Sequence, residues 1–83
     1  MKRWYPQVQA LARSDHVEIR ATTAWVMGQD NTVPEFHQAL LALLQDAHPI
    51  VRRNAALSLV RFADASGHEE IRGMLRSFAV RAP

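Results

Sequence analysis

Hydrophobic side chains recur every three or four residues along most of this chain, which is the period of a helix with one buried face. Five such segments are separated by short polar stretches that contain Pro, Gly, Asp or Asn, residues typical of turns. The pattern predicts five helices, over about residues 6–13, 15–28, 33–44, 49–63 and 67–80. Their expected buried residues are Val8, Leu11, Ala12, Ile19, Thr23, Ala24, Met27, Phe36, Ala39, Leu40, Leu43, Leu44, Val51, Ala55, Ala56, Leu59, Phe62, Ala63, Ile71, Met74, Leu75, Phe78 and Ala79.

Polar residues at the start of three segments indicate helix caps. A side chain that can cap a helix, followed three residues later by Glu, is the pattern of a capping box. Pro34 and Pro49 suit the first turn of a helix, and Gly28 is expected to end the second one. The predicted capping boxes are Asp15 with Glu18, Thr32 with Glu35, and Ser66 with Glu69.

Two of the segments repeat one pattern at a distance of thirty-two residues. Ile19-Arg20-x-x-Thr23-Ala24 reappears as Val51-Arg52-x-x-Ala55-Ala56, with Arg matching Arg and small or apolar residues at equivalent points. A helical repeat of this length is typical of stacked helical hairpins. The short connections make neighbouring helices antiparallel, so that about two and a half hairpins result.

The second copy of this pattern is similar to a known repeat. Asp46-x-x-Pro49-x-Val51-Arg52-x-x-Ala55-Ala56-x-x-Leu59 resembles the HEAT repeat, in particular its short form in phycobilin lyase subunits and bacterial repeat proteins. The resemblance covers about residues 8–79 and implies an all-α fold of antiparallel hairpins, stacked as a short right-handed α-solenoid. It implies one domain over 1–83, a segment of a longer array, with repeats at about 6–28, 33–63 and, incomplete, 67–80. Such repeats serve mainly as binding scaffolds.

Composition and charge narrow the function without naming a partner. The formal charge is +2, with nine Arg and one Lys, and there is no Cys. Disulfides and thiolate metal sites are therefore excluded. The longest apolar run, residues 39–44, is too short to cross a bilayer, and the basic start lacks the apolar stretch of a signal peptide. The default expectation is a cytoplasmic protein.

No arrangement of residues points to catalysis or to a cofactor. Deoxyhypusine hydroxylase repeats hold iron with His-Glu pairs, but the matching positions here are Ala21-Thr22 and Arg53-Asn54. His16 and His48 occupy equivalent positions, and helix packing separates such residues by about 8–10 Å, too far for one zinc ion. We therefore predict no enzyme activity, no metal and no cofactor.

Arg20 and Arg52 occupy one repeat position and allow two interpretations. They could contact phosphate or carboxylate groups of a partner. They could instead bond Asp side chains and carbonyls of neighbouring turns, with Asp15 and Asp46 nearby. The second interpretation is the one that the resemblance to HEAT repeats favours.

One surface is the candidate site. Residues off the buried stripes of the second and fourth helices should share one face, where Trp25 and Leu57 would form an apolar spot flanked by arginines. Trp and Arg are enriched at the energetic centres of interfaces. The alternative is that Trp25 only covers the edge of the next repeat. The predicted partner-binding residues are Trp25, Arg53, Asn54, Leu57 and Arg61.

The two ends of the stack raise the question of further partners. The apolar stripe of the fifth helix lacks a following helix, and Trp4 and Tyr5 pose the same question at the other end. Either more repeats follow, or the ends self-associate. The leading hypothesis is a non-catalytic scaffold that binds a protein. A nucleic-acid-binding repeat module is second. It ranks below the scaffold because the basic residues are spread over the chain and Lys is nearly absent, which gives only a weak footprint for phosphate groups. A non-catalytic part of a lyase-type assembly is third.

Overall fold

The computed structural model describes the backbone of residues 5–81 and the side chains of residues 6–77. The predictions for Trp4 and for the side chains of Tyr5, Phe78, Ala79 and Val80 fall outside these residues. Within them there is no strand, which confirms the all-α prediction, and none of the helices combines the length and apolar character needed to cross a bilayer. The elements are α1 (Tyr5–Leu11), α2 (Val17–Met27), α3 (Pro34–Leu43), α4 (Pro49–Val60), the 3₁₀ turn η2 (Ala65–Gly67) and α5 (His68–Arg81).

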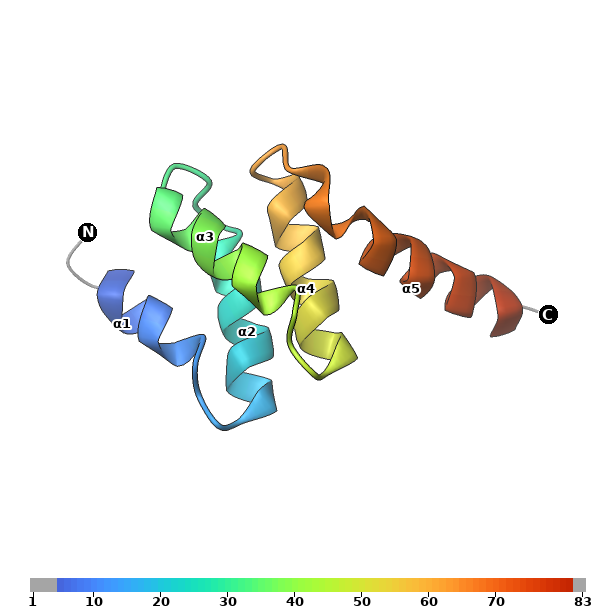
Figure 1. Ribbon diagram of the computed structural model, residues 1–83, viewed down its shortest axis with the longest axis horizontal. Coiled ribbons are helices and arrows are strands. Elements are labelled where there is room, and N and C mark those ends of the chain that lie inside the picture. Colours follow the sequence, from blue (N-terminus) through green and yellow to red (C-terminus); the bar gives the residue numbers. More distant parts are fainter. Residues whose placement is uncertain (1–4, 82–83) are drawn as a thin grey trace.

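Helices α2 and α4 lie side by side and run in the same direction (Figure 1). Two hydrogen bonds keep their register: Asn54 Nδ2 donates to the Ala21 carbonyl at 2.9 Å, and Ser58 Oγ donates to the Ala24 carbonyl at 2.7 Å. Helix α3 packs against both members of this pair, and α1 packs against α2 and α3. The result is a short stack of helical hairpins, as the sequence predicts.

Gly28 marks the closest approach of α2 and α4. It follows the last residue of α2, as expected, but its φ of −72° is an ordinary helical value, so it is not a left-handed terminator. A Cβ atom at Gly28 would lie 2.3 Å from Ser58 Oγ. The residue is glycine because of packing against the next repeat, and not because the chain turns there.

The core lies between α2, α3 and α4. Its largest fully buried side chains are Phe36, Met27, Leu40, Leu59 and Val51. These come from the predicted stripes of three helices, which confirms the assignment of the buried face in the middle of the stack. Because these side chains interdigitate across two repeats, the core belongs to the stack and not to any one hairpin.

Burial was predicted wrongly at the outer positions of the stripes. Leu11 is 48% exposed, Ile19 is 37% exposed and Leu75 is 61% exposed, and Ala63 is exposed with a φ of 55° in the corner after α4. Ile19 lies on the side of α2 away from α4, where α1 covers it only in part. The helical period shows which side chains share a face, but not whether a neighbour covers that face.

The capping boxes were also predicted wrongly. The N-cap residues of α2, α3 and α4 are His16, Val33 and His48, none of which has a side-chain cap bond in the described structure, and Ser66 lies within η2. Each corner is instead closed by a side-chain oxygen that lies before the helix and accepts the backbone N–H of the residue two positions later. These pairs are Ser14 with His16, Asp30 with Thr32, Asp46 with His48, and Asp64 with Ser66.

Helix α5 differs from the other helices in its surroundings. It begins against α4 and η2, where a Cβ atom on Gly67 would lie only 2.5 Å from Ala56 Cβ, and then leads away from the stack (Figure 1). The molecule is consequently elongated, with extents of 48 × 28 × 19 Å.

Candidate functional site

The two repeated arginines hold adjacent repeats together. Arg20 Nε donates to Asp46 Oδ2 at 2.7 Å and its Nη1 donates to the Ser14 carbonyl at 2.8 Å. Arg52 Nε donates to Glu70 Oε1 at 2.7 Å and its Nη1 donates to the Asp46 carbonyl at 2.9 Å. Each arginine therefore bonds a carbonyl six residues earlier and a carboxylate of the next repeat, which supports their structural interpretation.

These bonds change the proton affinity of the groups involved. The hydrogen bond from Arg20 holds the pKa of Asp46 below its usual value, although burial of the carboxylate opposes this effect. The same bond raises the pKa of Arg20. Asp46 is thus a charged acceptor for its own corner and for the preceding repeat. Of the two expected acceptors, Asp46 accepts from Arg20 and Asp15 lies at an exposed corner.

A second contact ties α3 to the corner after α4. His37 Nε2 lies 2.5 Å from Asp64 Oδ2, and the imidazole ring stacks on Phe62 with 4.9 Å between ring centroids. The hydrogen bond from His37, together with those from Ser66, lowers the pKa of Asp64 to about 2. This group closes the hairpin of the second repeat and lies on the side of the molecule away from the candidate site.

Trp25 and Leu57 share the face of α2 and α4 that α1 and α3 leave open. Trp25 follows the buried Ala24, Leu57 precedes the buried Ser58, and the parallel register of the two helices turns both side chains to the same side. Trp25 is 58% exposed and Leu57 is 46% exposed. Arg61 is also exposed and lies one helical turn beyond Leu57. We call the face formed by Trp25, Leu57 and Arg61 the B face.

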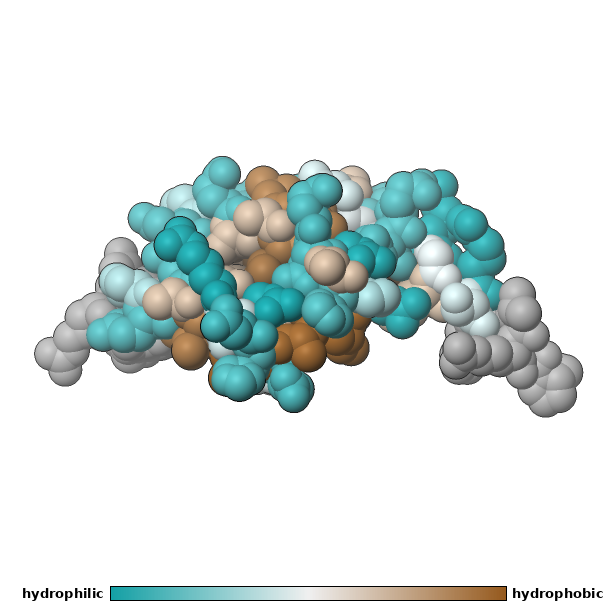
Figure 2. Space-filling view, turned by 60° about the horizontal axis from the view of Figure 1, so that its bottom comes forward, coloured by the Kyte–Doolittle hydropathy of each residue, from teal (hydrophilic) through white to brown (hydrophobic). Residues whose placement is uncertain are grey.

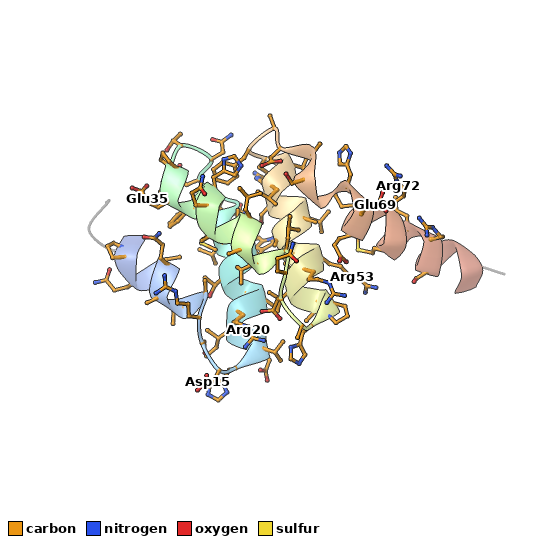
Figure 3. The ribbon with its side chains drawn as sticks, in the orientation of Figure 1. Asp15, Arg20, Glu35, Arg53, Glu69 and Arg72 are labelled. Carbon is orange, nitrogen blue, oxygen red and sulfur yellow. The ribbon has the colours of Figure 1, made fainter. Side chains whose placement is uncertain are left out.

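The other two predicted residues lie differently. Asn54 is half-buried and its amide donates to α2, so it positions the two helices. Arg53 occupies the position equivalent to Ala21, which α2 turns toward α4, and it therefore projects from α4 toward the side of α5 (Figure 3). Ala21 itself, which is not among the expected buried residues, is only 7% exposed. The structure thus brings three predicted residues together, uses one for packing and places Arg53 at the edge.

Sequence reasoning missed Ile50, which extends the apolar surface of the B face. This side chain is 52% exposed and precedes Leu57 by seven residues, the spacing of two helical turns. The spacing was available as a signal, because Ile50 lies within the predicted fourth helix, but it was named neither in the buried stripe nor in the candidate site. Figure 2 shows that the exposed apolar surface forms separate patches within a mainly polar surface.

The free charges also distinguish the B face from the arginine contacts within the stack. Arg20, Arg52 and Arg72 each have a carboxylate partner within 3.0 Å. Arg53 and Arg61 make no ion pair with any residue that the structure describes, and within that same set Arg53 Nε is buried without a hydrogen-bond partner. The exposed guanidinium group of Arg61 therefore remains available next to the exposed apolar side chains.

Helices α2 and α4 run parallel and are backed by antiparallel partners, and a repeated arginine links successive hairpins. These features define the class of helical-repeat solenoids. The sequence matches the family model of HEAT repeats over residues 6–81, and the chain belongs to the HEAT-repeat family. HEAT repeats are generally non-catalytic scaffolds for protein interactions. No curated protein and no solved structure matches the chain. The division into repeats at 6–28, 33–63 and 67–80 stays a prediction, as does the longer array.

Proposed function

We propose that this chain is a non-catalytic interaction module that binds a protein partner through the B face. The observation that carries the proposal is the exposure of Trp25 and Leu57 on adjacent parallel helices. An exposed Trp supplies a large apolar surface with few rotatable bonds, so its burial by a partner is a favourable way to gain binding energy. Arg61 beside this surface can pair with a carboxylate of that partner.

The packing of α2 and α4 makes the B face a rigid platform. Asn54 and Ser58 bond α2 carbonyls, and Gly28 admits Ser58 at close distance, so the two helices cannot slide past one another at low cost. A partner that buries Trp25 and Leu57 therefore orders few additional backbone groups. The cost of ordering on binding is correspondingly small.

The charge distribution favours a protein over a nucleic acid. Three of the described arginines are paired with carboxylates, and of the unpaired ones only Arg61 lies on the B face. A nucleic-acid interface needs several free cations in a row along the phosphate backbone. The B face offers an apolar centre with a single free cation, Arg61, instead, which suits an apolar side chain next to a carboxylate.

The test compares proteins enriched from extracts of the source cells by the parent chain and by two variants. Trp25→Ala removes the central side chain, while Gln38→Ala changes an exposed residue of α3 on the opposite layer and serves as the matched control. We expect a protein that is enriched by the parent and by Gln38→Ala and is lost with Trp25→Ala. Circular dichroism checks that all three chains are folded to the same extent.

Direct titration then decides the proposal. In a Trp4→Phe background Trp25 is the only tryptophan, so its fluorescence reports binding of the enriched protein. A saturable change that Leu57→Gln weakens supports the B face. Equal enrichment by the parent and by Trp25→Ala, or salt-sensitive binding of a DNA duplex that Trp25→Ala leaves unchanged, would overturn it.

A further inference from the structure

A groove between α1 and α2 lies at the opposite end of the stack from α5. It has a volume of about 300 Å³, and its surface is mainly apolar. The groove does not belong to the B face, because it opens on the side of α2 that points away from α4. We call it the end groove. It is lined by Val8, Leu11, Glu18, Ile19, Thr22, Thr23 and Val26.

The repeat itself shows what kind of surface the end groove is. Ile19, Thr22, Thr23 and Val26 correspond to Val51, Asn54, Ala55 and Ser58, thirty-two residues later. In the second repeat these four positions face the preceding helix: Val51 and Ala55 are fully buried, and Asn54 and Ser58 bond α2 carbonyls. In the first repeat Ile19 is instead 37% exposed. The end groove is therefore a stacking surface that no described helix occupies.

The other end of the molecule presents a helix with an uncovered apolar side. Ile71 and Met74 of α5 are half-buried, and Leu75, on the next turn of the same stripe, is 61% exposed. The helix leads away from the stack along the long axis of the molecule, which measures 48 Å (Figure 1). Because α1 and α5 lie at opposite ends of this axis, α5 cannot reach the end groove of its own chain.

The charges at the two ends are complementary. Glu18 lines the end groove, is exposed and has no ion-pair partner among residues 6–77. On α5, Arg76 follows Leu75 directly and is likewise exposed without such a partner in that range, while Arg72 lies one turn earlier and pairs only with the exposed Glu69. A helix whose apolar stripe enters the end groove would carry these cations to Glu18.

We propose that the end groove binds α5 of a second copy of this chain, so that molecules associate head to tail. The contact joins two different surfaces and leaves one groove and one helix free on every pair. Such heterologous contacts do not end at a dimer, and they build open chains or rings. The proposal concerns surfaces separate from the B face and does not depend on the proposed function.

The experiment measures molar mass by light scattering during size exclusion, with the full chain at about 5–500 μM, the range of weak contacts. The parent is expected to rise in mass continuously with concentration. Leu11→Gln in the groove and Leu75→Gln on the helix each replace an exposed leucine, so both variants should stay folded by circular dichroism. Each should weaken self-association by about tenfold or more. Leu57→Gln on the B face is the matched control and should associate like the parent.

Mixing the two variants tests the head-to-tail geometry. Leu11→Gln keeps a working helix and Leu75→Gln keeps a working groove, so an equimolar mixture should form heterodimers and go no further. A parent that stays monomeric over the whole range overturns the proposal. So does a Leu11→Gln protein that associates like the parent, which would indicate contacts between α5 helices. A mixture that remains monomeric while the parent associates also contradicts it.

Discussion

Helices α3 and α5 carry similar apolar stripes and differ in what surrounds them. Phe36 and Leu40 of α3 are at most 1% exposed because α3 packs on both α2 and α4. Leu75 of α5 is 61% exposed because α5 packs on α4 and η2 and then leaves the stack. The difference shows that an apolar stripe in a helical repeat becomes buried only when a neighbouring helix packs on it. Its burial depends on whether a second hairpin is present.

The largest expected effect comes from placing a charge in the core that covers the stripe of α3, at Leu59 of α4, and comparing it with a charge on α5. Leu59→Asp puts a carboxylate at a fully buried position between the repeats and should unfold the domain, because an unpaired buried charge costs about 4 kcal/mol or more. Leu75→Asp should leave the domain folded, since the side chain already faces water. Thermal melting followed by circular dichroism measures both. Equal melting temperatures for Leu59→Asp and the parent would mean that the core is assigned to the wrong face.

Two glycines sharpen the comparison at the level of single atoms. Gly28→Ala should lower stability by about 1–3 kcal/mol, because the new Cβ meets Ser58 where that hydroxyl bonds Ala24. Gly73→Ala lies on α5 with no neighbouring atom within 4 Å and should raise stability by up to about 1 kcal/mol through helix propensity. Urea denaturation gives both values. A neutral Gly28→Ala would contradict the close approach of α2 and α4.

A third test compares Arg20, which bonds the next repeat, with Arg53, which makes no ion pair with a described residue. Arg20→Gln should lower the melting temperature, because it removes two bonds to Asp46 of the next repeat and one to the Ser14 carbonyl of its own repeat. Arg53→Gln, at the edge of α4 that faces α5, should change the free energy of unfolding by no more than about 0.5 kcal/mol, because Arg53 makes no ion pair with a described residue and its Nε has no hydrogen bond to lose. Melting curves of the two variants beside the parent decide the point. A larger loss of stability for Arg53→Gln than for Arg20→Gln would mean that Arg53, and not Arg20, holds the repeats together.

The smallest effect concerns the contact between His37 and Asp64, which ties α3 to the corner after α4 and has no counterpart in the described contacts of α5. The pKa of Asp64 falls from 3.8 to about 2 on folding. The stabilisation is therefore complete above pH 3.8 and is lost as the pH falls toward 2. The difference in melting temperature between the parent and Asp64→Asn should shrink over that window. Glu35→Gln, on the exposed side of α3, is the control and should show no such convergence.

The middle of the fold could be predicted from the sequence because both partners of each contact lie within the chain. The stripe of α3 and the pairs Thr23-Ala24 of α2 and Ala55-Ala56 of α4 predicted most of the core. The structure buries both pairs and, of the α3 stripe, Phe36, Leu40 and Leu43. The capping boxes were predicted wrongly because several polar residues at each corner can cap it. The backbone path selects Ser14, Asp30, Asp46 and Asp64 by the N–H group that each can reach.

The sequence by itself determined the helical period, the repeat and the family, since these depend on local spacing and on side-chain type. It also placed Trp25 and Leu57 off the buried stripes. Only the tertiary structure decided that Asn54 bonds α2, that Arg53 lies at the edge of α4, and that Ile19 and Leu75 are exposed. The physical reason is that burial and hydrogen bonding between repeats are set by which neighbour is present and how closely it packs, and a helical period carries neither.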